Sequence, residues 1–223
     1  MKAEEAREKI LKGVRYLSGT IKGDLVLKGV TIEGDLNLDG TIFKGNVDFR
    51  SVTLKGNLSL KRAICKGNVD FGGATVRYLD FKKTNFKDSL NLREVTLEGD
   101  LNLEGATIEG DTDLTKATMN YLNSAGATFK GDVSLVDATI KNHLILATAT
   151  SKKDMHLRRT TVKGTADFRE AILKSDLDIA GGIFEGYVFL STKEGPKAIY
   201  VSSEMVEQIH WAAPNVPLLV IEK

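Results

Sequence analysis

The chain has 223 residues, enough for one substantial core, and its 31 basic and 30 acidic side chains leave a net charge of +1. This balance argues against recruitment by nucleic acid or by an anionic membrane, and no window is apolar for long enough to cross a bilayer. The single cysteine, Cys65, excludes an intramolecular disulfide and fits a reducing compartment, so we expect a cytoplasmic location. The alternative is an exported chain whose signal has already been removed.

The first segment, residues 1–20, is charged and amphipathic, unlike a signal peptide with its apolar centre. Its apolar side chains recur at helical spacing: Ala6, Ile10, Val14 and Leu17. The pattern predicts an N-terminal helix that covers one end of the repeat array that follows.

From residue 21 to residue 191 the sequence repeats every eleven residues, in units such as GDLNLDGTIFK, GNVDFRSVTLK and GDVSLVDATIK. Two steps of ten residues, which end at Leu79 and Leu122, interrupt the register. Each unit holds two short stretches in which apolar and polar side chains alternate, separated by turn residues. Such stretches are too short for ordinary strands, so the sequence predicts an all-β solenoid.

The apolar–polar–apolar triplets of this array resemble those of the pentapeptide-repeat family: Ala106–Ile108, Ala138–Ile140 and Ala166–Phe168. The resemblance implies a right-handed quadrilateral parallel β-helix with four short faces per coil. An extra residue in alternate stretches departs from the family pattern and makes about 22 residues per coil.

Alternate units carry different outward residues, which predicts two units per coil on opposite walls. One set consists of threonines: Thr31, Thr53, Thr75, Thr96, Thr118, Thr139 and Thr161. The interleaved set is mixed: Ile42, Ile64, Asn85, Thr107, Thr128, Thr150 and Ile172. A threonine column on a flat β-helix also raises ice binding as an alternative, although threonine is a favoured strand residue in any case.

Glycines recur at one corner of the units: Gly34, Gly45, Gly56, Gly67, Gly99, Gly110 and Gly131. We expect the backbone to need unusual dihedral angles there. The Asp or Asn that follows each of them suits a turn, because its side chain can bond nearby backbone.

The last segment, residues 192–223, is expected to close the other end as part of the same domain. It predicts a strand, a helix and a strand: Lys197–Val201, Glu204–Ala212 with Ser203 as its N-cap, and Leu218–Ile221. Trp211 either anchors this cap or belongs to a dimer interface.

The histidines and carboxylates predict no catalytic residue, cofactor or metal site. His143 takes a turn slot, His156 faces outward between Ser134 and Asp178, and His210 falls in the C-terminal helix, so they form no zinc ligand set. An outward column holds Asp48, Asp70, Asn91 and Asp113. Backbone bonding is the favoured role of this column, and cation binding is the alternative. Cys65 is expected to point inward as core filler.

Four isoleucines, Ile42, Ile64, Ile172 and Ile183, are expected to line up on one wall. With Trp211 they form the candidate interaction surface, and the alternative is that they pack beneath a terminal helix.

The sequence therefore predicts a non-catalytic structural or protein-binding solenoid. Its partner would be another protein or a second copy in a homodimer. One alternative is a DNA mimic that binds a topoisomerase, as some relatives of this family do, but the near-zero net charge argues against it. Another is a carbohydrate-active or metal-dependent enzyme on the rod face, which sparse outward aromatics disfavour.

Overall fold

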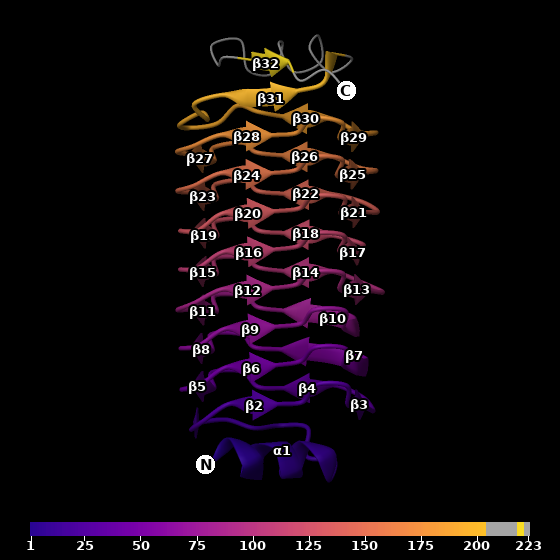
Figure 1. Ribbon diagram of the computed structural model, residues 1–223, viewed down its shortest axis with the longest axis vertical. Coiled ribbons are helices and arrows are strands. Elements are labelled where there is room, and N and C mark those ends of the chain that lie inside the picture. Colours follow the sequence, from indigo (N-terminus) through magenta and orange to yellow (C-terminus); the bar gives the residue numbers. More distant parts are fainter. Residues whose placement is uncertain (204–217, 221–223) are drawn as a thin grey trace.

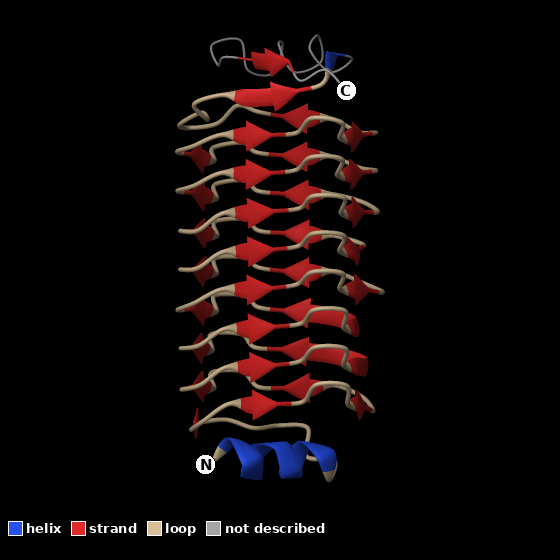
Figure 2. Cartoon of the chain, viewed as in Figure 1, coloured by secondary structure: helices blue, strands red, loops and turns tan. Residues whose placement is uncertain are grey.

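The computed structural model describes residues 1–203 and 218–220 and confirms the predicted fold class (Figure 1). The chain is a parallel β-solenoid of about eight turns of roughly 22 residues, with one N-terminal helix. Each turn adds short strands to four walls, which we number in the order in which the chain meets them from residue 25 onward. Figure 2 shows how the strands of successive turns stack, and the pairings between them are parallel.

The first wall is a ten-stranded sheet: β2 (Leu25–Val26), β6 (Val47–Asp48), β9 (Val69–Asp70), β12 (Leu90–Asn91), β16 (Thr112–Asp113), β20 (Val133–Ser134), β24 (Met155–His156), β28 (Leu177–Asp178), β31 (Ile199–Val201) and β32 (Leu218–Val220). The fourth wall is an eight-stranded sheet: β1 (Thr20–Ile21), β5 (Ile42–Phe43), β8 (Ile64–Cys65), β11 (Asn85–Phe86), β15 (Thr107–Ile108), β19 (Thr128–Phe129), β23 (Thr150–Ser151) and β27 (Ile172–Leu173).

The second and third walls form one sheet, because β7 (Thr53–Ser59) and β10 (Thr75–Asp80) run through the corner between them. The rest of the second wall is β3 (Thr31–Ile32), β13 (Thr96–Leu97), β17 (Thr118–Met119), β21 (Thr139–Ile140), β25 (Thr161–Val162) and β29 (Ile183–Phe184). The rest of the third wall is β4 (Leu36–Asn37), β14 (Leu101–Asn102), β18 (Leu122–Asn123), β22 (Leu144–Ile145), β26 (Ala166–Asp167) and β30 (Val188–Phe189).

The N-terminal helix α1 (Ala3–Leu11) lies across the open end of the first turn (Figure 1). It buries Ala3, Ala6 and Ile10, and Arg7 Nε donates a hydrogen bond to the Val26 carbonyl oxygen at 3.0 Å. The helix is shorter than predicted, because Gly13 adopts a φ of +95° just beyond its end and turns the chain away.

The two remaining members of the predicted helical stripe therefore lie outside the helix. Val14 is exposed, whereas Leu17 is buried. The Leu17 N–H donates to the carbonyl oxygen of Asn37, so this residue already belongs to the solenoid backbone.

The interior is filled by aliphatic and aromatic side chains that stack in columns from one coil to the next. Phe49 and Phe71 are fully buried, and their rings stack with centroids 4.7 Å apart. Phe81 packs against Phe71 with ring centroids 5.5 Å apart. The alternation of apolar and polar residues thus places one continuous core inside the rod.

Cys65 lies in this core, as predicted, and burial raises the pKa of its thiol to about 12. Because the thiolate is the reactive species, we expect iodoacetamide to leave Cys65 unmodified in the folded protein at mildly alkaline pH and to label it fully in guanidinium. Mass spectrometry would follow the labelling, with an exposed cysteine introduced by Thr53→Cys as the positive control. Labelling of both thiols at similar rates would contradict the buried placement.

The corner glycines have a different role from the one predicted. Of the predicted set, Gly34 has a positive φ, whereas the others adopt ordinary dihedral angles. A Cβ on Gly131 would lie 2.5 Å from the carbonyl oxygen of Gly110 and 2.6 Å from its carbonyl carbon. Most of these glycines are therefore needed because successive coils approach closely at this corner.

Left-handed dihedral angles occur at a different turn, once per eleven-residue unit. Glycine fills several of these positions, such as Gly105 and Gly126, each with a φ of +64°. Long polar residues fill others, including Arg62 and Lys83, each with a φ of +57°. The mixed residue types explain why this turn was not identified from glycine spacing.

Side chains at the close-approach corner bond to the next coil instead of to their own turn. The Asn46 N–H donates to Asp24 Oδ1 at 2.7 Å, and the Asn68 N–H in turn donates to Asn46 Oδ1 at 2.9 Å. The predicted backbone-bonding role of these residues is confirmed, but the bond joins residues 22 apart in the sequence. The resulting ladder of side chains provides hydrogen-bond acceptors for backbone N–H groups of the adjacent coil.

At the C-terminal end, β31 confirms the first predicted strand of the cap, although it begins at Ile199, two residues later than expected. β32 pairs with β31 and confirms the last strand over its described residues. The predicted helix Glu204–Ala212, which includes His210 and Trp211, lies outside the described residues, although its predicted N-cap, Ser203, lies within them. The cap and the role of Trp211 therefore remain predictions.

Candidate functional site

The threonine column is confirmed by the strand register. Each of its members pairs with the next on the second wall, from Thr31 opposite Thr53 to Thr139 opposite Thr161. The interleaved column is confirmed on the fourth wall in the same way. Outward residues 22 apart therefore stand side by side, and the surface can be described column by column.

The four candidate isoleucines do not form one patch. Ile42 and Ile64 are paired neighbours on the fourth wall, and Ile172 lies on the same wall near its other end, beside Thr150. Ile183 follows Thr161 on the second wall, so the expectation that it shares their column is wrong. Ile183 comes eleven residues after Ile172, and a step of eleven residues moves the chain half a turn around the rod.

The two histidines in the described part of the chain lie at different places on the rod. His143 Nδ1 accepts a hydrogen bond from the Thr165 N–H at 2.8 Å, so this side chain serves in the corner ladder. His156 stands outward between Ser134 and Asp178, as predicted. Among the described residues, no group of three or more His, Cys, Asp and Glu side chains is arranged to hold a metal ion.

The aspartate column of the first wall is occupied by structural bonds. Asp48 accepts hydrogen bonds from Arg50 Nη2 at 2.6 Å and from the Arg50 backbone N–H at 3.0 Å. Asp70 accepts from the Gly72 N–H at 2.8 Å and from Asn91 Nδ2 at 3.0 Å. The arginine side chain lowers the pKa of Asp48, which keeps this carboxylate ionised near neutral pH.

A similar pair on the third wall leads to a prediction about acid stability. Arg169 Nη2 and Nε donate to buried Asp167 at 2.6 and 2.9 Å and lower the pKa of its carboxyl group. A lowered folded-state pKa stabilises the protein above the unfolded-state pKa of about 3.9, and this contribution is lost as the pH falls through the folded-state value.

We therefore expect Asp167→Asn to cost stability at neutral pH and progressively less as the pH falls below about 4. Urea denaturation of both proteins across this range measures the difference in unfolding free energy. Asp35→Asn, an exposed aspartate that bonds the Asn57 N–H, is the matched control. A difference that stays constant with pH for Asp167→Asn would contradict the assignment.

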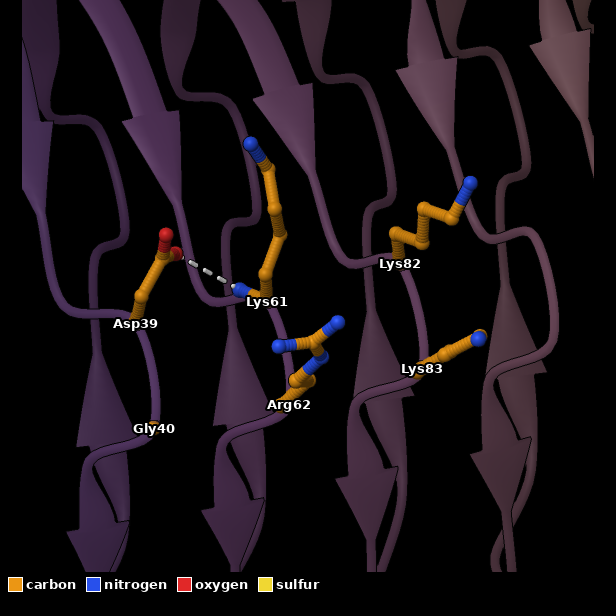
Figure 3. A pocket seen from close by; sticks show the side chains of 6 residues that line it. All are labelled: Asp39, Gly40, Lys61, Arg62, Lys82 and Lys83. Atoms are coloured by element: carbon orange, nitrogen blue, oxygen red, sulfur yellow. Dashed lines mark hydrogen bonds between the residues drawn. The ribbon is translucent and has the colours of Figure 1, made fainter.

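A basic hollow lies at the turn between the third and fourth walls (Figure 3). It has a volume of about 380 Å³ and is lined by Asp39, Gly40, Lys61, Arg62, Lys82 and Lys83. Asp39 Oδ1 accepts the Lys61 backbone N–H at 2.9 Å and also the hydroxyl of Ser59. Asp39 is thus engaged by the backbone, and the remaining charged groups around the hollow are cations.

Two of these cations already have acidic partners. Lys61 Nζ lies 3.2 Å from Asp80 Oδ2, and Lys82 Nζ lies 2.8 Å from Glu104 Oε2. Arg62 and Lys83 are exposed and make no ion pair with any residue that the structure describes. The hollow therefore presents two cations without an ion-pair partner, and the Asp39 carboxylate offsets part of their charge.

A second row of lysines follows the opposite edge of the fourth wall. Lys44, Lys66 and Lys87 each follow an inward residue of that wall, and their backbone N–H groups donate to the coil before. Lys87 pairs with Glu109 at 2.8 Å, while Lys44 and Lys66 have no ion-pair partner within the described residues. Neither basic edge was identified as a candidate site from the sequence. The cations of one edge are about 22 residues apart in the sequence and become neighbours only on adjacent coils of the solenoid.

The two ten-residue steps mark a shallow feature on the corner between the second and third walls. β10 shifts register between Val76 and Tyr78, where the chain is one residue short. Tyr78 lines a hollow of about 670 Å³ there, and it also borders a smaller one together with Tyr121. Burial raises the pKa of Tyr78, so its phenol stays protonated.

Comparison with known proteins identifies the repeat and assigns no role to these surfaces. Residues 92–139 match a family model described as pentapeptide repeats (9 copies), about a fifth of the chain. No curated protein and no solved structure matches the chain. No helix in the described part of the chain is both long and apolar enough to cross a membrane.

Proposed function

The chain is a pentapeptide-repeat protein, and we propose that it serves as a rigid, non-catalytic rod whose walls bind another protein or a second copy of the chain. The repeat architecture supports a structural or interaction role. Solenoids present extended, regular surfaces of this kind, and each turn is held by its neighbours. We further propose that the rod works in the cytoplasm, as the single cysteine suggests.

The observation that carries the proposal is that four side chains of the kinds used in catalysis are engaged or buried by the scaffold. His143 accepts a backbone N–H, Asp48 and Asp167 are held by arginines, and Cys65 is buried with a raised pKa. A catalytic group needs access to a substrate and a proton or electron pair that it can give or take. These groups lack that freedom, whereas the outward columns face the surroundings of the rod and can contact a partner.

Light scattering coupled to size exclusion, over a hundredfold range of protein concentration, tests for self-association first. We expect either a concentration-dependent dimer or a monomer that forms a stable cross-linked complex with one partner. Substitution of Ile42 and Ile64 by serine should weaken the assembly if it involves the fourth wall. A turnover activity lost on substitution of an exposed wall residue would overturn the proposal.

DNA mimicry is the weaker candidate, because a mimic needs a strongly acidic surface and the fourth wall has basic edges. An unaltered topoisomerase supercoiling assay at high protein excess would remove it.

A further inference from the structure

We infer that the N-terminal half of the fourth wall is a binding surface for an extended acidic segment of a partner protein. This inference rests on the proposed interaction role and adds the chemistry of the partner. The surface, here called the basic face, consists of Ile42 and Ile64 with their flanking cations: Lys44, Arg62, Lys66 and Lys83.

The basic face has an apolar centre between two positive edges. Ile42 and Ile64 are paired neighbours on flat, parallel strands, and both are half-buried. Arg62 comes two residues before Ile64, and Lys66 comes two residues after it. Arg62 is a turn residue with a φ of +57°, and Lys66 follows the strand, so the two cations stand on either side of the apolar centre.

The charges on this face are not balanced within the described chain. Arg62, Lys83, Lys44 and Lys66 are exposed and lack ion-pair partners there, whereas Lys61, Lys82 and Lys87 are paired with acids. Coils stack about 4.8 Å apart, so each edge repeats its positive charge at that interval. Like charges at this spacing repel, and an acidic partner relieves the repulsion.

The hollow lined by Arg62 and Lys83 makes one edge of the basic face concave. Figure 3 shows the Lys61 and Lys82 side chains extending away from the turn alongside the preceding strands, while Arg62 and Lys83 point sideways toward the next coil. A carboxylate placed at the Arg62 and Lys83 side of this hollow would meet a guanidinium and an ammonium group, away from Asp39 of the preceding coil. An arginine fork binds a carboxylate in a directed way that a lone lysine does not.

The spacing favours a peptide that crosses the wall in an extended conformation. Its side chains repeat on one face about every 6.7 Å, so an acidic–x–apolar–x–acidic pattern places a carboxylate over each edge and an apolar residue over Ile64. A nucleic acid fits less well, because single strands are usually held by stacking on aromatic rings, and the outward positions of the fourth wall hold Ile, Thr and Asn.

Fluorescence anisotropy with a labelled peptide of sequence Glu-Thr-Val-Thr-Glu-Thr-Val-Thr-Glu tests the inference on the full chain. We expect saturable binding that weakens by about tenfold when salt is raised well above physiological strength. Arg62→Glu with Lys66→Glu should weaken it at least about tenfold. Lys141→Glu with Lys163→Glu makes the same charge change at another corner and should leave binding within about twofold.

Several outcomes would overturn the inference. These are absence of binding, equal binding of a scrambled peptide with its acids clustered, and equal loss in both charge-reversal pairs. Equal or tighter binding of oligo-dT, or of vesicles containing phosphatidylserine, would assign the face to polyanions or membranes instead. A partner cross-linked to another wall and unaffected by Arg62→Glu with Lys66→Glu would overturn this inference while leaving the proposed function intact.

Discussion

Replacing Phe71 with alanine is expected to lower the free energy of unfolding by about 4 kcal/mol. The Phe71 ring is fully buried and stacks on Phe49, with an angle of 7° between the ring planes. The substitution removes the apolar surface of one ring and leaves a cavity beneath two others, Phe49 and Phe81. The closed walls leave the coils little room to collapse into it.

Urea denaturation followed by circular dichroism measures this change, with Tyr187→Ala as the control. Tyr187 is an aromatic residue that is 75% exposed, so its removal should cost less than about 1 kcal/mol. Because each turn of a solenoid contacts only its neighbours, the Phe71 cavity should also weaken the coupling between the coils on either side. Equal losses for the two variants would contradict the placement of the Phe71 column.

The eleven-residue period was sufficient to predict the walls, because it determines both the side that each residue faces and its neighbour on the next coil. The threonine column and the fourth-wall column follow from this register. The same period also determines the place of Ile183. The expectation that Ile183 shares a column with Ile172 was wrong because successive units lie half a turn apart around the rod.

Other features depend on properties that the period does not encode. The end of α1 depends on the backbone angle of Gly13, because the apolar stripe itself continues through Val14 and Leu17. The net charge of the basic face depends on which lysines form an ion pair with an acidic side chain of a neighbouring coil. Lys87 finds Glu109, and Lys66 finds none among the described residues. Such pairing is decided by side-chain geometry at the corners.

Gly131→Ala should be the most informative substitution at a turn, with an expected loss of about 3 kcal/mol. The added methyl group would be forced against the backbone of Gly110, with 2.5 Å to its carbonyl oxygen, and neither coil can move without breaking the wall hydrogen bonds. The φ of Gly131 is not positive, so the backbone angle itself accepts alanine.

Gly126→Ala is the matched control, five residues earlier in the same coil. Its φ is +64°, but the nearest atom to an added Cβ, Thr148 Oγ1, is 3.7 Å away, which is ordinary contact. Only the left-handed strain of about 1 kcal/mol should appear there. A larger loss at Gly131 than at Gly126 would show that close approach of the coils requires glycine at this corner. The reverse order would restore the backbone angle as the reason for the regular spacing of glycine along this chain.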